Sequence, residues 1–109
     1  MAELVAHVPA PPIELRLREA LRGAPTEAEL RRLSEEGDGW ARVLQGLIDD
    51  CEGRLAGYSV DPARELAEIA AELRRLDSLR RELLEVRGLL AELEERSRDL
   101  RSQWLAGRR

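Results

Sequence analysis

The sequence contains no phenylalanine, lysine or asparagine, and it has one cysteine and one histidine among its 109 residues. A single cysteine excludes an internal disulfide framework and suits a reducing cytoplasm. No apolar run approaches the roughly 18 residues that a membrane span requires, and the N-terminus lacks the features of a signal peptide. Aromatic residues make up 3% of the chain, so the core must be built from leucine and alanine. We therefore expect a protein of the cytoplasm, or of a macromolecular assembly such as a virion, with no membrane contact.

Charge is abundant but evenly mixed along the chain. The 18 basic residues, all arginine, face 22 acidic ones, which gives a net charge of -4. Interspersed charges of both signs are typical of solvated helix faces and give little attraction to nucleic acid or anionic membranes. Leucine is much more frequent than isoleucine or valine, which favours helix over sheet. The composition predicts an all-α protein.

We expect an extended, proline-rich arm over residues 1–12, followed by a single helical domain. The apolar periodicity and the cap signals predict helices at about 13–22, 27–36, 39–56 and 62–105. In this interpretation the last two helices form an antiparallel hairpin whose second arm projects beyond the first.

The expected helix ends depend on a few local signals. Gly23 and Gly37 are placed as helix stops, and Thr26 forms a capping box with Glu29. Asp61, followed by proline at the first helical position, is placed as the N-cap of the long helix. The long helix contains one glycine, Gly88, and we expect it to continue through it because the apolar pattern keeps its phase there.

The helix expected at 39–56 carries a stripe of glycines spaced seven residues apart. Glycine inside a helix costs about 1 kcal/mol relative to alanine, so such a stripe suggests close approach by another backbone. Tolerated drift explains the pattern equally well, and the sequence leaves both open. The stripe is Gly39, Gly46 and Gly53.

The most informative feature is an apolar seam that runs from Leu66 to Trp104 with near-heptad spacing. The spacing slips once, between Leu76 and Leu79, where the 39–56 helix is expected to stop covering it. The two short helices offer few apolar residues, so we expect a second chain to cover the distal seam. The predicted interface residues are Leu79, Leu83, Val86, Leu90, Leu93, Leu100 and Trp104.

Candidates for chemistry are few. His7 lies in the proline-flanked arm, and Cys51 falls on the apolar face of its helix, where a core role is expected. Asp49, Asp50 and Glu52 could hold a hard cation, but adjacent residues on a helix diverge, so we expect a solvated face. We predict no catalytic, cofactor-binding or metal-binding residue.

The sequence resembles no family that we recognise. We predict a non-enzymatic subunit that oligomerises, or docks on another helical protein, through the 79–104 seam, as in a virion (phage) or secretion assembly. A small chaperone, adaptor or inhibitor that binds one other protein is the first alternative. A helix-turn-helix over 26–56 is the second, but Arg42 and Arg54 are outnumbered there by acidic residues that DNA phosphates would repel.

Overall fold

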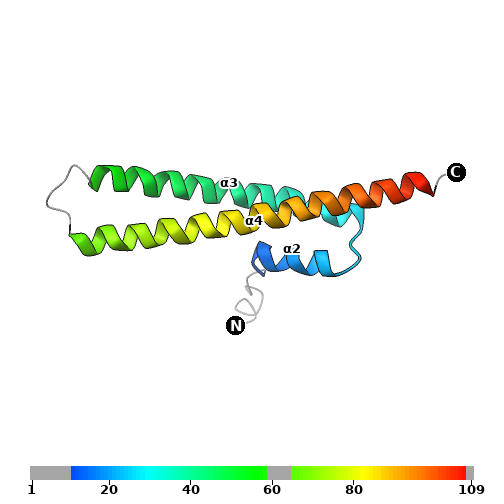
Figure 1. Ribbon diagram of the computed structural model, residues 1–109, viewed down its shortest axis with the longest axis horizontal. Coiled ribbons are helices and arrows are strands. Elements are labelled where there is room, and N and C mark those ends of the chain that lie inside the picture. Colours follow the sequence, from blue (N-terminus) through cyan, green and yellow to red (C-terminus); the bar gives the residue numbers. More distant parts are fainter. Residues whose placement is uncertain (1–10, 59–64, 108–109) are drawn as a thin grey trace, which may run out of the picture.

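The computed structural model describes residues 11–58 and 65–107, which form three helices and, within those ranges, no strand (Figure 1). They are α2 (Ile13–Arg22), α3 (Glu27–Tyr58) and α4 (Leu66–Ala106). The prediction of an all-α protein is confirmed. The arm over residues 1–10 and the expected start of the last helix at Asp61 lie outside the described residues.

The first helix, α2, occupies the residues expected of it. Pro12 precedes it with an extended backbone (φ -53°, ψ 146°), and a proline there needs no hydrogen bond for its missing N–H. At the other end the Gly23 N–H donates to the carbonyl oxygens of Glu19 and Ala20, at 3.2 and 3.3 Å. Leu17 is the one fully buried residue of α2 and anchors it to the two longer helices.

The predicted break at Gly37 is wrong, because α3 runs through it as one helix of 32 residues. A Cβ atom added at Gly37 would lie 2.5 Å from Cδ2 of Leu90, so the glycine lets a leucine of α4 pack directly on the α3 backbone. Its role is close helix packing rather than helix termination. The N-terminal cap expected at Thr26 is present, since its Oγ1 accepts a hydrogen bond from the Glu29 N–H at 3.1 Å.

The two long helices, α3 and α4, lie side by side and run in opposite directions, with α2 beside the C-terminal half of α4 (Figure 1). The helix α4 continues through Gly88, as expected. The molecule is long and shallow, with principal extents of 71, 43 and 18 Å. A depth of 18 Å leaves room for two helices at the usual separation of about 8–10 Å. Among residues 11–58 and 65–107, the long helices therefore keep faces that no third layer covers.

The core has two parts. The first joins α3 to the middle of α4, and the second joins α2 to the start of α3 and the end of α4. The residues of the first part are Leu44, Ile48, Cys51, Leu76, Leu83 and Val86. Those of the second part are Leu17, Leu30, Leu33 and Leu93. No polar or charged residue of the described chain is buried.

The expectation that the chain cannot cover its own distal seam is wrong. Because α3 does not stop at Gly37, Leu30 and Leu33 extend its apolar face along α4, and α2 adds Leu17. Leu93 is 1% exposed at the junction of the three helices. The seam is therefore used for folding over most of its length.

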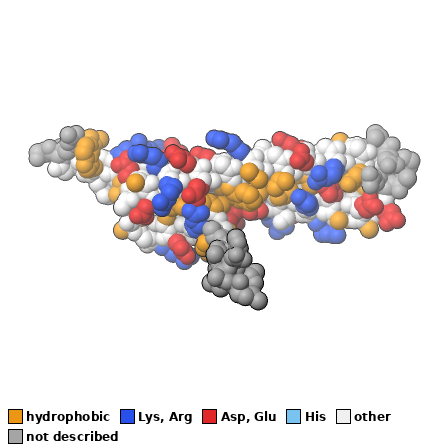
Figure 2. Space-filling model, turned by 180° about the vertical axis from the view of Figure 1, so that it is seen from behind, with side chains coloured by type: hydrophobic (Ala, Val, Ile, Leu, Met, Phe, Trp, Pro, Cys, Tyr) orange, Lys and Arg blue, Asp and Glu red, His pale blue; other side chains and the backbone are white. Residues whose placement is uncertain are grey.

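The surface agrees with the mixed charge of the sequence. Figure 2 shows acidic and basic side chains alternating along the helices on one face, with apolar side chains gathered between them. In the described ranges, no helix has a stretch long and apolar enough to cross a membrane.

Candidate interaction surface

The residues predicted to form an interface fall into three groups. Leu83, Val86 and Leu93 are buried within the chain, at 5%, 0% and 1% exposure. Three others are half-buried against the two core clusters, and they are Leu79, Leu90 and Leu100. Only Trp104 is largely exposed, at 60%. The inner line of the seam is thus occupied by the chain's own helices.

A line of apolar residues on α4 is left exposed. Two of its members, Leu66 and Leu73, belong to the predicted seam, and the sequence reasoning missed the other two. Its leucines are separated by 7, 11 and 21 residues, which places them along one side of a helix. They are 52–83% exposed, and we call them the exposed leucine line. The line consists of Leu66, Leu73, Leu84 and Leu105.

The register between α3 and α4 is fixed on this side by two polar contacts. An amino group of Arg80 donates to Glu52 Oε1 at 3.1 Å, and one of Arg87 donates to Gln45 Oε1 at 3.4 Å. Each step of seven residues back along α3 thus matches a step of seven forward along α4. Each such pair of opposite positions is one level of the register. The next two levels, seven residues apart, bring Asp38 opposite Glu94 and Arg31 opposite Arg101.

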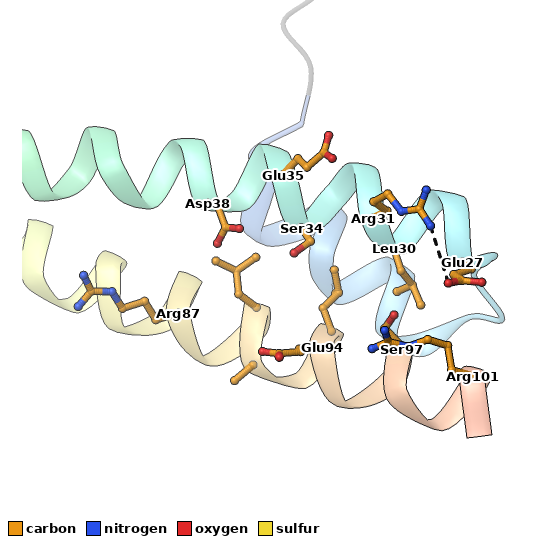
Figure 3. A pocket seen from close by; sticks show the side chains of 13 residues that line it. Glu27, Leu30, Arg31, Ser34, Glu35, Asp38, Arg87, Glu94, Ser97 and Arg101 are labelled. Carbon is orange, nitrogen blue, oxygen red and sulfur yellow. Dashed lines mark ion pairs between the residues drawn. The ribbon is translucent and has the colours of Figure 1, made fainter. Parts of the chain in front are cut away.

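At those two levels the helices border an open groove of about 640 Å³ (Figure 3). In the close-up, α2 lies behind the pair, so the groove opens on the side away from it. Leu30, Leu90 and Leu93 contribute apolar surface, and Ser34 and Ser97 lie between the charged levels. Because like charges face each other across the groove at both levels, no ion pair bridges it there.

A smaller hollow lies at the distal end, where α3 begins. It measures about 450 Å³ and is lined by Pro25, Thr26, Glu27, Leu100, Arg101 and Trp104. Trp104 therefore borders a partly apolar hollow.

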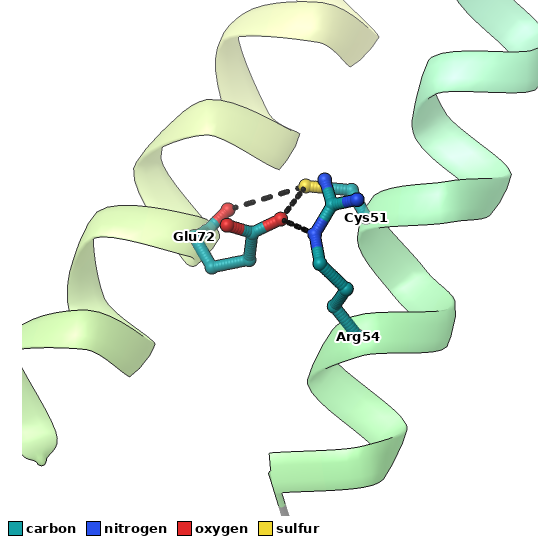
Figure 4. A network of polar contacts seen from close by, with 3 residues as sticks. All are labelled: Cys51, Arg54 and Glu72. Atoms are coloured by element: carbon teal, nitrogen blue, oxygen red, sulfur yellow. Dashed lines mark hydrogen bonds and ion pairs between the residues drawn. The ribbon is translucent and has the colours of Figure 1, made fainter. Parts of the chain in front are cut away.

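Cys51 belongs to a polar network between the two long helices (Figure 4). Its Sγ donates to Oε1 of Glu72 at 2.9 Å, and Nε of Arg54 donates to the same oxygen at 2.7 Å. Burial raises the pKa of the Cys51 thiol, and the adjacent Glu72 carboxylate adds to the effect. Hydrogen bonds from Cys51 and Arg54 lower the pKa of Glu72. A neutral, buried thiol is a poor nucleophile, so this arrangement serves packing, as expected for Cys51.

A second network attaches α2 to the long helices. Trp40 Nε1 donates to Oε1 of Glu14 at 3.2 Å, and burial together with the Glu14 carboxyl raises the pKa of Glu82. Arg16 pairs with Glu36 at 2.6 Å, and Arg18 pairs with Glu85. Sequence periodicity could not reveal these contacts, because each joins residues that are far apart in the chain.

Arg96 closes the end of α2. One of its amino groups donates to the carbonyl oxygen of Gly23 at 2.8 Å, and the other donates to that of Leu21 at 3.5 Å. Carbonyl groups at a helix C-terminus lack hydrogen-bond donors within the helix, so Arg96 of α4 donates to them instead.

The other candidates for chemistry do not converge. Asp49 and Asp50 are exposed, and the Asp49 carboxylate accepts a hydrogen bond from Gln45. Among the residues that the structure describes, no three histidine, cysteine or acidic side chains gather as a metal site. His7 lies outside those residues. The turn that a helix-turn-helix requires is absent from residues 27–58, so that interpretation is wrong.

Comparisons with known protein families, with curated protein sequences and with solved structures give no match.

Proposed function

We propose that this protein is a non-enzymatic helical subunit that works by binding another helical surface along the side of α3 and α4 that bears the groove. The observation that carries the proposal is the exposed leucine line, Leu66, Leu73, Leu84 and Leu105. Fully burying a leucine contributes about 1.5–3 kcal/mol, so covering even part of this line would stabilise a complex substantially.

The line and the groove lie on the same side of the molecule. Leu84 borders a small hollow together with Ile48 and Arg87, and Arg87 also lines the groove. Ala91, seven residues beyond Leu84, lines the groove as well. The polar contacts of α2 with α4 involve other positions, Glu82, Glu85 and Arg96. A continuous surface from Leu84 to Leu105 is thus available for binding.

The proposed surface replaces the inner line of the seam, since Leu83, Val86 and Leu93 are occupied within the chain. We further propose that the protein acts in the cytoplasm or inside a larger assembly, such as a virion or secretion complex. A small chaperone or adaptor that binds one other protein would use the same surface, with a foreign helix in place of a second copy.

Substitution of the exposed leucines tests this proposal. We expect Leu84→Gln/Leu105→Gln to reduce association, measured by sedimentation equilibrium, while urea unfolding shows the free energy of unfolding nearly unchanged. The matched control is Leu15→Gln, which alters a leucine of α2 that is 47% exposed and lies away from the surface. Association that survives the double substitution would contradict the proposed binding side.

A further inference from the structure

The groove carries an alternating order of charges along its length. From the distal end inward it presents Glu27, then Arg31 opposite Arg101, then Asp38 opposite Glu94, and finally Arg87. Glu35 also borders the groove, at the level of the serines, and its side chain points away from α4 (Figure 3). We call Arg31 and Arg101 the basic pair, and Asp38 and Glu94 the acidic pair. Ser34 and Ser97 separate the two pairs (Figure 3).

These charges have little internal compensation. Among residues 11–58 and 65–107, Arg31 contacts Glu27 at 3.8 Å, and Arg87 donates to the neutral amide of Gln45. Asp38, Glu94 and Arg101 form no ion pair within the same ranges. Like charges that face each other across a groove repel. A partner that brings charges of opposite sign into the groove would therefore bind favourably.

The order of charge is self-complementary when it is read in the opposite direction. Apart from Glu35 at the level of the serines, it runs negative, positive, serine, negative, positive, so reversal about the serines brings the basic pair opposite the acidic pair. In a two-fold symmetric contact every surface patch meets its counterpart on an identical copy. A two-fold axis at the serines would place the acidic pair of one copy on the basic pair of the other. A parallel copy at the same level would place like charges together.

We propose that the groove is occupied by the same groove of a second copy of this chain, antiparallel, with the two-fold axis near Ser34 and Ser97. This inference rests on the proposed function and names its partner. The acidic and basic pairs are separated by seven residues, or roughly 10 Å along each helix, so both sets of contacts form together.

The apolar surface fits the same arrangement. Leu105 follows Arg101 by one helical turn on the same side of α4 and is 62% exposed. Along α4, Leu105 lies on one side of the two-fold axis, and Leu90 and Ala91 lie at about the same distance on the other side. In the antiparallel pair Leu105 therefore covers half-buried Leu90 and exposed Ala91 of the second copy. Small serine side chains at the axis allow the helices to approach.

Two charge variants and their mixture test the pairing. Arg31→Glu/Arg101→Glu makes both pairs acidic, and Asp38→Arg/Glu94→Arg makes both pairs basic. The matched control, Asp50→Arg/Asp99→Arg, changes the net charge as much as the basic variant does, at two exposed positions that do not line the groove. Light scattering after size exclusion and native mass spectrometry report the masses.

The expected result is a wild-type mass of about twice 12.3 kDa, which the control retains. Each groove variant alone is expected to be monomeric, because like charges meet in both halves of the contact. An equimolar mixture is expected to form the heterodimer, which increasing salt dissociates. Circular dichroism confirms that the variants are folded. If either is not, Arg101→Glu and Glu94→Arg alone carry the same test.

Three results would overturn the proposal: a monomeric wild type, groove variants that remain dimeric alone, or folded variants whose mixture does not pair. A monomeric wild type leaves docking on a different protein as the proposed function. Oligomers that tolerate the charge variants but not Leu84→Gln/Leu105→Gln overturn the groove pairing and retain the proposed binding side.

Discussion

Replacing Gly37 by alanine tests the account of α3 as one helix packed directly on α4. Inside a helix, glycine to alanine normally stabilises by about 1 kcal/mol. At Gly37 the new Cβ would lie 2.5 Å from Leu90 Cδ2 and 3.3 Å from its Cγ, so Leu90 would have to move out of its site. Overpacking of this kind costs about 1–3 kcal/mol. We expect Gly37→Ala to leave the free energy of unfolding unchanged or lower it by up to about 2 kcal/mol.

The matched control for Gly37→Ala is Gly46→Ala in the same helix. Nothing lies within 4 Å of a Cβ at Gly46, so this change is expected to stabilise by up to about 1 kcal/mol. Urea unfolding followed by circular dichroism, at one protein concentration, measures both variants. In a double-mutant cycle, Leu90→Ala should relieve part of the Gly37→Ala penalty. Equal stabilisation by Gly37→Ala and Gly46→Ala would refute the close packing of Leu90 on Gly37.

Three further predictions concern the core and the attachment of α2. Leu93→Ala should lower the free energy of unfolding by about 2–5 kcal/mol in urea unfolding, because Leu93 is 1% exposed. Leu84→Ala should change the free energy of unfolding of the monomer by no more than about 0.5 kcal/mol, because Leu84 is exposed. Equal losses would contradict the assigned core. The raised pKa of Glu82 means that its contribution to stability is complete below the ordinary glutamate pKa and is lost as pH rises through the folded-state pKa. Glu82→Gln should therefore raise the urea midpoint at neutral pH and raise it less in acid, and a pH-independent difference would contradict this. Finally, burial of Cys51 predicts alkylation by iodoacetamide only as fast as the chain opens, so modification at the rate of a free thiol would show that the site is accessible.

Local patterns were sufficient for part of this fold. The leucine-rich composition and the seam predicted helices, and the continuity of α4 through Gly88 followed from the phase of that seam. Gly37 was misinterpreted because a glycine after an apolar stripe is typical of a helix end. Its true environment depends on Leu90, which lies 53 positions further along the chain. Single-sequence reasoning contains no information about such a contact.

The same limit explains the prediction of the interface. The seam correctly indicated that α4 needs a partner helix, but periodicity does not say whether that helix belongs to the same chain. Once α3 continues through Gly37, Leu30 and Leu33 reach Leu93 and occupy the inner line. Leu66 and Leu73 of the exposed leucine line were already part of the seam, whereas Leu84 and Leu105 were overlooked because neither occupies a position of the seam. The alternating charges of the groove emerge only when α3 and α4 are placed in register.

We propose that this chain associates through the side of α3 and α4 that bears the groove, and its mass in solution decides whether it does. Light scattering of the full chain, from micromolar to millimolar concentration, should give about twice 12.3 kDa, and Leu84→Gln/Leu105→Gln should give the monomer mass. A wild-type chain that stays monomeric throughout that range, with its groove and exposed leucines uncovered, would contradict self-association.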